Sequence, residues 1–297
     1  MNRHPLPPAI PAVEANESLE SARARNVREA LAEDIGRGDW TALLVPAARQ
    51  VRARVTAKEP AVLCGQAWFE DCLRALDPQA RMIWAVAEGA SVKGGTMVCD
   101  IEAEARALLS AERSALNFLQ LLSATATQTR RYVDAIAGAS PNPRGCAVLD
   151  TRKTMPGLRQ AQKYAVRVGG GQNQRLALWH GILIKENHIA AAGGIAPALQ
   201  AAAALGSGVP VQIEVESLDE LQQALGSGAT SVLLDDFTLA QMREAVALTS
   251  GRALLEVSGG VDLAHIRDIA ATGVDRISVG KLTKDVQAVD LSLRVLG

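Results

Sequence analysis

Four cationic side chains lie close together in the sequence, each beside a short apolar run or a glycine-rich turn: Arg152, Lys153, Arg175 and Lys185. The apolar runs are short and rich in β-branched residues, which predicts buried strands. Three of the cations then follow strand ends, where α/β folds gather their ligands. Cations held together repel one another unless an anion lies among them. This segment therefore predicts a site for a ligand with several negative charges.

Two acidic residues lie at the ends of the next two expected strands, Glu214 and Asp235. In the first of these strands, Gln212, Glu214 and Glu216 alternate, which places them on one face. A carboxylate that points inward is costly unless it is paired or bound to a metal ion. The pair predicts ligands of Mg²⁺, held directly or through water, or partners of sugar hydroxyls. Ion pairs with the nearby lysines are the structural alternative.

Small residues end the last two expected strands. Ser258, Gly259 and Gly260 follow one strand, and Gly280 follows the other. Turns of this kind expose backbone N–H groups to a phosphate, so we predict a phosphate site there. The sequence lacks the glycine patterns of dinucleotide and Walker-type nucleotide sites, and its histidines lack the nucleophile elbow of serine hydrolases.

Strands and helices alternate from about residue 145 onward, which predicts parallel βαβ units. The strands are apolar at consecutive positions, so we expect them to be buried on both faces. Six strands at this spacing favour a barrel, and a doubly wound open sheet is the alternative. The expected strands are 146–149, 181–184, 209–215, 231–234, 253–257 and 275–279, and the expected helices lie near 156–168, 195–204, 217–226, 238–249 and 262–271.

The preceding part of the chain has a different pattern. A long helix is expected after about residue 110, with Ser110 as its N-cap. Arg113 would then lie in the first turn, where a cation is unfavourable against the helix dipole, and this placement suggests a functional role. The other expected elements are a proline-rich extended arm at 1–16, helices at 18–33 and 66–76, and strands with turns between 51 and 104.

The composition is that of a soluble globular protein: 48% of the 297 residues are hydrophobic, 21% are charged and the net charge is −1. A broad basic face and stacking aromatics are missing, which disfavours nucleic-acid binding. The four cysteines form no C-x-x-C pair and only four histidines occur, so we expect reduced thiols and no zinc site. The sequence shows no signal peptide or membrane-spanning run, so we expect a cytoplasmic protein without membrane contact.

Several longer motifs together resemble the quinolinate phosphoribosyltransferase family, the carboxylating nicotinate-nucleotide pyrophosphorylases. The resemblance runs in order from about residue 25 to the carboxyl terminus. The motifs are Glu112-Arg-Ser-Ala-Leu-Asn-Phe-Leu-Gln120, Asp150-Thr-Arg-Lys-Thr-Met-Pro-Gly-Leu-Arg159, Lys163-Tyr-Ala-Val166, Gly169-Gly-Gly-Gln-Asn173, Leu183-Ile-Lys-Glu-Asn-His-Ile189, Glu214-Val-Glu216, Leu234-Asp-Asp-Phe237, Glu256-Val-Ser-Gly-Gly260 and Ile277-Ser-Val-Gly-Lys-Leu-Thr283.

The resemblance implies an α/β fold: an α/β-sandwich amino-terminal domain, residues 1–112, followed by an incomplete parallel α/β barrel, residues 113–284, with residues 285–297 returning to the first domain. It implies transfer of a phosphoribosyl group from phosphoribosyl pyrophosphate to quinolinate with loss of CO₂. The products would be nicotinate mononucleotide, pyrophosphate and CO₂, in NAD biosynthesis. Mg²⁺ is the implied cofactor, and the implied assembly is a homodimer, with further assembly left open.

The positions that bind the two carboxylates of quinolinate in the family are matched by Arg113, Arg152, Arg175 and Lys185. The resemblance implies that Arg113 reaches the site from the neighbouring subunit of a dimer. Gln174 departs from the pattern, since many members have histidine there. Glutamine donates a hydrogen bond but neither carries charge nor titrates, so any role for a protonated histidine is in doubt.

The part of the site that holds phosphoribosyl pyrophosphate is matched as well. Lys153 corresponds to the lysine that faces this substrate, and Glu214 and Asp235 correspond to the acidic pair near the ribose and Mg²⁺. These three are the implied catalytic residues. Asp285 stands where histidine or serine is more familiar. The other implied substrate-binding residues are Thr151, Ser258, Gly259, Gly260, Val279, Gly280 and Lys281.

Two other functions stay open at this point. A related phosphoribosyltransferase with another acceptor, of the type associated with molybdate uptake, would keep the phosphate-binding parts. It would alter the carboxylate clamp, the set formed by Arg113, Arg152, Arg175 and Lys185. A non-catalytic anion-binding barrel is the alternative without an activity. The presence of all four cations that match the clamp favours quinolinate.

Overall fold

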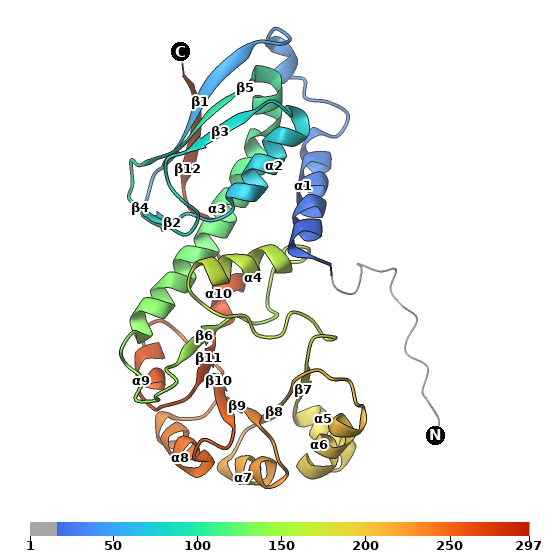
Figure 1. Ribbon diagram of the computed structural model, residues 1–297, viewed down its shortest axis with the longest axis vertical. Helices are drawn as coiled ribbons and strands as arrows, with labels where there is room; N and C mark the ends of the chain where they lie inside the picture. The colour runs from blue at the N-terminus through green and yellow to red at the C-terminus, as the bar shows by residue number, and fades with distance from the viewer. Residues whose placement is uncertain (1–16, 297) are drawn as a thin grey trace.

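The computed structural model describes residues 17–296, so the arm expected at residues 1–16 lies outside the described part of the chain. Figure 1 shows two regions, an upper and a lower one in that view, joined by the long helix α3 (Ala105–Ile136). None of the helices in the described residues is long and apolar enough to cross a membrane.

The first region is an antiparallel sheet with helices packed beside it (Figure 1). The sheet order is β12 (Leu291–Leu296), β1 (Gln50–Ala57), β5 (Met97–Glu104) and β3 (Arg81–Trp84), and the other elements are α1 (Leu19–Ile35), η1 (Ala42–Leu44), β2 (Ala61–Val62), α2 (Gln66–Leu76) and β4 (Ser91–Val92). Ala53, Val55 and Ala57 of β1 are buried because a strand with one face in the core has a period of two. Strand β12 pairs with β1, so the end of the chain belongs to this sheet.

Helix α3 begins earlier than the sequence suggested. The side chain of Glu104 accepts a hydrogen bond from the N–H of Ala107 (2.8 Å) and caps the helix, so the expectation that Ser110 is the N-cap is wrong. Ser110 lies inside the helix and donates to Asp39 (2.8 Å). Arg113 consequently lies beyond the first turn, where the helix dipole has little effect on a cation, and the dipole argument for its role does not hold.

The second region is a parallel sheet of six strands, which Figure 1 shows as an open arc with helices outside it. In sheet order the strands are β6 (Ala147–Leu149), β11 (Arg276–Ser278), β10 (Leu254–Ser258), β9 (Ser231–Asp235), β8 (Val211–Val215) and β7 (Ile182–Ile184). The helices are α4 (Arg159–Val168), α5 (Glu186–Ala192), α6 (Ile195–Ala204), α7 (Leu218–Gly226), α8 (Leu239–Thr249), α9 (Ile266–Ala270) and α10 (Lys281–Lys284). Helix α5 was not expected, because seven residues are too few to show a helical period.

This strand order is that of a barrel. Consecutive strands are neighbours from β7 to β11, and β6, the first strand of the region, pairs with β11, the last. A doubly wound sheet would instead change direction part-way through its strand order. The ring is open between β6 and β7, where a single parallel bridge joins Leu149 to Gln172. The predicted fold, a sandwich domain followed by an incomplete α/β barrel, is confirmed.

Helix α3 contributes to both hydrophobic cores. Its residues from Leu108 to Ala126 pack in the core of the first region, and Tyr132 and Ile136 pack in the core of the barrel. The boundary predicted between residues 112 and 113 therefore falls within a continuous helix, and the side chains of that helix change core further along. A rigid helix shared by two cores fixes the first region relative to the barrel.

Candidate active site

A buried ion pair lies at the carboxyl end of β6. Asp150 is 0% exposed, and its carboxylate accepts a hydrogen bond from the ammonium group of Lys163 on α4, which is 1% exposed. Asn173 Nδ2 (2.6 Å) and the N–H of Gln174 (2.9 Å) donate to the same carboxylate, and Lys163 also donates to the carbonyl of Gln174 (2.9 Å). Burial raises the pKa of Asp150 and lowers that of Lys163, while their mutual attraction opposes both shifts. The pair fastens the loop 172–175 to the end of β6.

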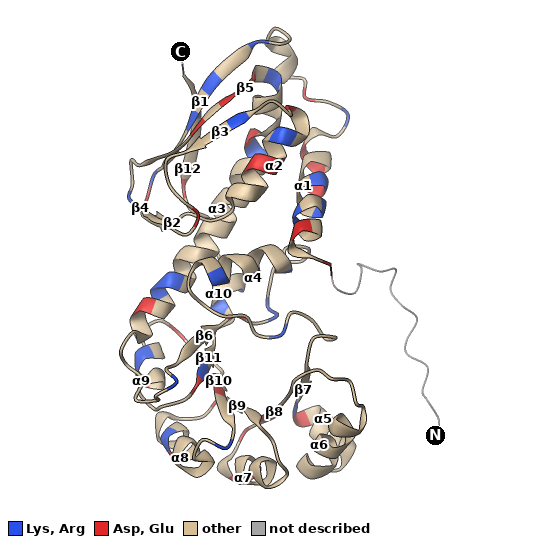
Figure 2. Cartoon of the chain, in the orientation of Figure 1, with Lys and Arg blue, Asp and Glu red and all other residues tan. Residues whose placement is uncertain are grey.

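Three arginines surround this pair without a carboxylate partner of their own. Arg152 follows β6, Arg159 begins α4 and Arg175 ends the loop; none of them forms an ion pair with any residue in 17–296. Burial, and then the charge of Arg152, lower the pKa values of Arg159 and Arg175. The buried Nε of Arg152 has no hydrogen-bond partner in the described part of the chain. Figure 2 shows Lys and Arg segments on the chain between α4 and the barrel strands. A multiply charged anion would relieve this repulsion.

Two carboxylates occupy the neighbouring strand ends β8 and β9. Glu214, which is 6% exposed, accepts two hydrogen bonds from Lys185 Nζ (2.7 and 2.8 Å), and Asp235 accepts one from Ser258 Oγ (2.5 Å). Burial raises the pKa of Glu214, and Lys185 opposes that rise. Lys185, one of the four cations expected to bind the carboxylates of quinolinate, therefore forms an ion pair with Glu214, one of the two expected ligands of Mg²⁺. An ion pair of this kind is the structural alternative that the sequence predicted. Glu216 lies past the end of β8 and is exposed, so it does not share the buried face with Gln212 and Glu214.

Gly259 and Gly260 of the predicted phosphate site have positive φ angles, which favour glycine, and Gly259 in addition has no room for a side chain. At Gly259, where φ is +97°, a Cβ atom would lie 1.9 Å from Asp236 Oδ1. At Gly280 a Cβ would lie 3.1 Å from Lys153 Cδ. In the part of the chain that the structure describes, the backbone N–H groups of Gly259, Gly260 and Gly280 have no recorded protein acceptor. The N–H of Val279, by contrast, donates to Leu149 O (2.8 Å), so this amide is not free for a phosphate.

Lys153 lies beside this glycine turn. Its side chain runs past Gly280, and its backbone is held by Thr151 Oγ1 (3.1 Å) and by the hydroxyl of Thr283, which donates to Lys153 O (2.8 Å). Thr151 lies within reach of the same turn. Lys281 is exposed at the start of α10. The structure thus brings Thr151, Lys153 and Gly280 together at the edge where β6 and β11 end.

Arg113 is not part of this cluster within its own chain. It is exposed on α3 between Ala111 and Ala115, which pack in the core of the first region. At a rise of about 1.5 Å per residue, it lies about 25 Å along the helix from Arg130, whose Nε donates to Gly169 O at the barrel end of α3. Arg113 acts electrostatically on its neighbour Glu112, whose pKa burial raises and Arg113 lowers.

The two departures from the family pattern have different surroundings. The side chain of Gln174 points into the barrel and donates to Gln212 Oε1 (3.1 Å). Asp285 is exposed at the end of α10 and lines a different cavity, with Glu59 and Arg131. Its N–H donates to Lys281 O (3.4 Å), and among residues 17–296 its carboxylate forms an ion pair with Lys284 and no hydrogen bond with the glycines of the phosphate turns.

Several residues of the site were not singled out as site residues from the sequence. Lys163 and Asn173 were visible as members of the resemblance motifs, and a lysine among the buried positions of α4 was the signal that could have found the first. Arg159 lay at the end of another motif. Gln212 and Glu256 are joined by a buried hydrogen bond (2.9 Å) that crosses from β8 to β10, which no local pattern indicates.

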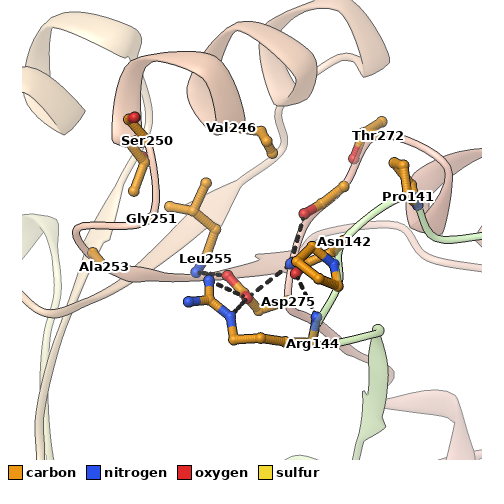
Figure 3. A pocket seen from close by; sticks show the side chains of 13 residues that line it. Pro141, Asn142, Arg144, Val246, Ser250, Gly251, Ala253, Leu255, Thr272 and Asp275 are labelled. Carbon is orange, nitrogen blue, oxygen red and sulfur yellow. Dashed lines mark hydrogen bonds and ion pairs between the residues drawn. The ribbon is translucent and has the colours of Figure 1, made fainter.

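Another cavity, of about 360 Å³, lies at the opposite ends of the barrel strands (Figure 3). Its charged and amide groups are paired with one another, whereas the buried hydroxyl of Thr249 has no hydrogen-bond partner among residues 17–296. Asp275 accepts hydrogen bonds from Arg144 (2.9 Å), Asn142 (2.9 Å) and the N–H of Leu255 (2.8 Å). This network ties the segment before β6 to β10 and β11, so we interpret it as structural.

Arginines without an ion-pair partner among residues 17–296, phosphate-type turns and two carboxylates lie at one edge of an incomplete α/β barrel, an arrangement typical of enzymes that act on small, multiply charged anions. The family described as "Quinolinate phosphoribosyl transferase, N-terminal domain" matches residues 39–123, and its C-terminal domain matches residues 125–294. The chain belongs to the quinolinate phosphoribosyl transferase family.

Individual relatives agree with this assignment. The "Nicotinate-nucleotide pyrophosphorylase [carboxylating]" of Mycobacterium leprae is 40% identical over 277 residues, covering 90% of this chain and 95% of that protein. A probable enzyme of the same name in Bacillus subtilis is 37% identical, covering 89% of this chain and 90% of that protein. Among solved structures, the nicotinate-nucleotide pyrophosphorylase of Francisella tularensis superposes with a TM-score of 0.89 at 43% identity, covering 95% and 98% of the two chains.

Proposed function

We propose that this chain transfers the phosphoribosyl group of phosphoribosyl pyrophosphate to quinolinate and releases pyrophosphate and CO₂, making nicotinate mononucleotide for NAD biosynthesis. The observation that carries the proposal is the set of three arginines around the Asp150–Lys163 pair that have no carboxylate partner among residues 17–296. Quinolinate carries two carboxylates on adjacent ring atoms, and guanidinium groups bind carboxylates through paired hydrogen bonds. Family membership supports the same reaction.

Arg152, Arg175 and Lys185 would hold the two carboxylates of quinolinate, and the adjacent Arg159 adds positive charge to the same place. The clamp would point the ring nitrogen at C1 of the ribose. As the bond from C1 to the pyrophosphate oxygen breaks, pyrophosphate leaves with the electron pair, and the ring nitrogen forms the new bond to C1. The resulting pyridinium accepts the electrons of the bond to the 2-carboxylate, CO₂ leaves, and a proton from water takes its place.

The phosphoribosyl pyrophosphate would lie across the ends of β8 to β11 and β6. The N–H groups of Gly259, Gly260 and Gly280, which have no acceptor among residues 17–296, support a place for the 5′-phosphate, beside Ser258 and Lys281. Lys153, which packs on Gly280, would face the pyrophosphate. Positive charge develops on the ribose as pyrophosphate departs, and the carboxylates Glu214 and Asp235 would stabilise it.

We propose Mg²⁺ as the cofactor. The described residues contain no group of three or more His, Cys, Asp or Glu side chains that could hold a metal ion by themselves. Glu214 and Asp235 supply two carboxylates from neighbouring strands, one of them paired with Lys185. This set fits Mg²⁺, which keeps water and substrate phosphate oxygens as most of its ligands. When bound, the ion would neutralise charge on the leaving pyrophosphate.

We further propose a homodimer in which Arg113 of one chain completes the clamp of the other. Exposed apolar side chains support it. Trp40 (79% exposed) and Leu44 (83%) lie in the segment that the Asp39–Ser110 hydrogen bond fixes beside the Arg113 end of α3. Trp179, also exposed, follows Arg175 in the barrel. Apolar patches at both halves of a divided site are what a shared interface requires. Whether dimers assemble further is a separate question for the same measurement.

If this interface forms, Leu44→Asp should dissociate the dimer, because a charge would be buried without a partner. We expect the molar mass in solution to fall to that of one chain and the specific activity to fall with dilution. Leu263→Asp is the matched control, since Leu263 is also exposed but lies beside α9. Light scattering checks both variants. A dimer that persists in Leu44→Asp at micromolar concentration would contradict this interface.

The reaction itself is tested by incubating the protein with quinolinate, phosphoribosyl pyrophosphate and Mg²⁺ while CO₂ release is followed. We expect equal amounts of CO₂ and nicotinate mononucleotide, and no activity after the divalent cations are chelated. The other acceptor considered, that of the molybdate-associated type, is not favoured, because the curated relatives carry the carboxylating name.

The substitution Arg175→Lys keeps the positive charge and removes the planar guanidinium group, so it tests whether Arg175 binds a carboxylate through two parallel hydrogen bonds. A lysine ammonium group has three donors on one nitrogen but cannot present two parallel, coplanar donors to a carboxylate, so we expect kcat/KM for quinolinate to fall at least about tenfold while the melting temperature stays unchanged. The KM for phosphoribosyl pyrophosphate is the internal control. Quinolinate kinetics equal to those of the unmodified protein would remove Arg175 from the clamp.

We also propose a cytoplasmic location. The four cysteines are free thiols, and three of them are buried, which supports residence in a reducing compartment.

A further inference from the structure

A chain of hydrogen bonds crosses the interior of the barrel from the substrate-binding loop to the opposite strands. Gln174 Nε2 donates to Gln212 Oε1 (3.1 Å), and Gln212 Nε2 donates to Glu256 Oε2 (2.9 Å). Ser278 Oγ donates to Glu256 Oε1 from the other side (2.5 Å). Glu256 is 2% exposed. The chain therefore connects the loop to β8, β10 and β11 through side chains alone.

The carboxylate fixes the direction of every bond in this chain. A carboxylate accepts hydrogen bonds and does not donate them, so the amide group of Gln212 must turn its nitrogen toward Glu256. Its oxygen then faces Gln174, which must in turn present its nitrogen. The buried amide of Gln212 lies between two fixed partners and has one favourable orientation. This orientation in turn fixes that of the Gln174 amide, which must donate to Gln212.

A cavity of about 440 Å³ lies under this chain. Its lining includes the first residues of five strands, together with Gln174, Arg175, Gln212 and Glu256. The cavity thus opens toward the amino ends of the strands, whereas Lys185, Asp235 and Ser258 stand at the carboxyl ends. Gln174 and Arg175 thus border open space on that side, and the hydrogen-bond chain ties the loop across it.

The loop needs such support because the positive charge of Arg175 is repelled by that of Arg152. Arg152 and Arg175 stand close enough for the charge of Arg152 to lower the pKa of Arg175. The backbone of Gln174 is fastened to Asp150 and Lys163, and one nitrogen of Arg175 donates to Gly181 O (2.8 Å). These bonds fix the backbone and one end of the guanidinium group. The side chain of Gln174 adds a tie to the far wall of the barrel.

We propose that Gln212 and Glu256 are positioning residues that hold the Gln174–Arg175 segment in place for the acceptor substrate through this directed hydrogen-bond chain. The inference rests on the proposed role of Arg175 in binding quinolinate. Neither residue touches the substrate. Their effect should therefore appear in the KM for quinolinate, and the KM for phosphoribosyl pyrophosphate and kcat should change little.

Gln212→Met breaks the chain at its centre while keeping the length of the side chain. We expect the KM for quinolinate to rise about tenfold, the effect of one lost buried hydrogen bond, with kcat within about twofold. Ser231→Ala is the matched control, because Ser231 lines the same cavity and takes no part in the chain. We expect its kinetic constants to be unchanged.

An exchange of charge tests the direction of the chain. In Gln212→Glu alone, two carboxylates face each other, so we expect a loss larger than that of Gln212→Met. In the double variant Gln212→Glu/Glu256→Gln, the new carboxylate at 212 accepts from both sides, and the nitrogen of Gln174 keeps its acceptor. We expect the double variant to return the KM for quinolinate to within about threefold of the unmodified protein.

These measurements separate the inference from the proposed function. If Arg175→Lys impairs quinolinate binding but folded Gln212→Met does not, the positioning role is wrong and the reaction stands. A double variant no better than Gln212→Glu would equally overturn it. If Gln212→Met does not fold, Gln174→Met removes the same hydrogen bond at the edge of the cavity and must give the same rise in KM. An unmodified protein without activity on quinolinate would instead refute the proposed function.

Discussion

An equal mixture of two inactive variants, Arg113→Ala and Lys153→Ala, should recover about one quarter of the activity of the unmodified protein after the subunits exchange. Random pairing puts half of the chains into mixed dimers. In a mixed dimer, the barrel with an intact Lys153 receives an intact Arg113 from its partner, and the other site lacks both residues. Each mixed dimer thus has one working site of two.

The expected recovery is large because both single variants should lose nearly all activity. Arg113 is exposed on the part of α3 that belongs to the first region, whereas Lys153 lies on the barrel against Gly280. Two controls are each variant alone after the same exchange treatment, and an affinity-tagged pull-down that verifies mixed dimers. If mixed dimers form and no activity returns, each site is built from a single chain and Arg113 has another function.

Much of the barrel could be predicted from the sequence because each strand is a short apolar run between turn residues. The expected strand 231–234 and β9 (Ser231–Asp235) agree to within one residue, and the expected helix 66–76 and α2 coincide. The start of α3 could not be predicted in the same way. Both Glu104 and Ser110 are polar residues before an apolar period. In the structure Glu104 accepts from the N–H of Ala107, whereas the hydroxyl of Ser110 donates to Asp39, and the sequence indicates neither contact.

The position of the cations could also be predicted, since parallel strands end at one edge of a barrel. Their partners could not. Lys185 contacts Glu214, which is 29 residues away, and Gln212 contacts Glu256 two strands farther on. Which inward side chains meet depends on the stagger of the strands around the barrel, and no local pattern specifies that stagger. The burial of Lys163 is a further case, because a lysine on a helix is ordinarily expected in solvent.

Lys163→Met should lower the free energy of unfolding by about 3 to 5 kcal/mol, because it leaves the carboxylate of Asp150 buried without a counter-charge. The remaining donors, Asn173 and the N–H of Gln174, are neutral. Asp150→Asn should be destabilising for the converse reason, since it leaves the ammonium group of Lys163 buried without a negatively charged partner. The double variant Asp150→Asn/Lys163→Met removes both charges, so we expect it to be more stable than either single variant.

The deficit of Lys163→Met should depend on pH in a direction that the pKa of Asp150 fixes. Burial already raises this pKa and Lys163 opposes the rise, so removing Lys163 raises it further. The folded state then binds a proton more tightly than the unfolded state, and stability falls as pH rises through the elevated pKa. The deficit should be largest at neutral pH and should shrink in acid, where Asp150 is protonated in both states. Urea unfolding at several pH values measures it, with Lys284→Met, an exposed lysine, as the control. A deficit that is equal at all pH values would mean that the lost stability comes from packing and not from the buried charge.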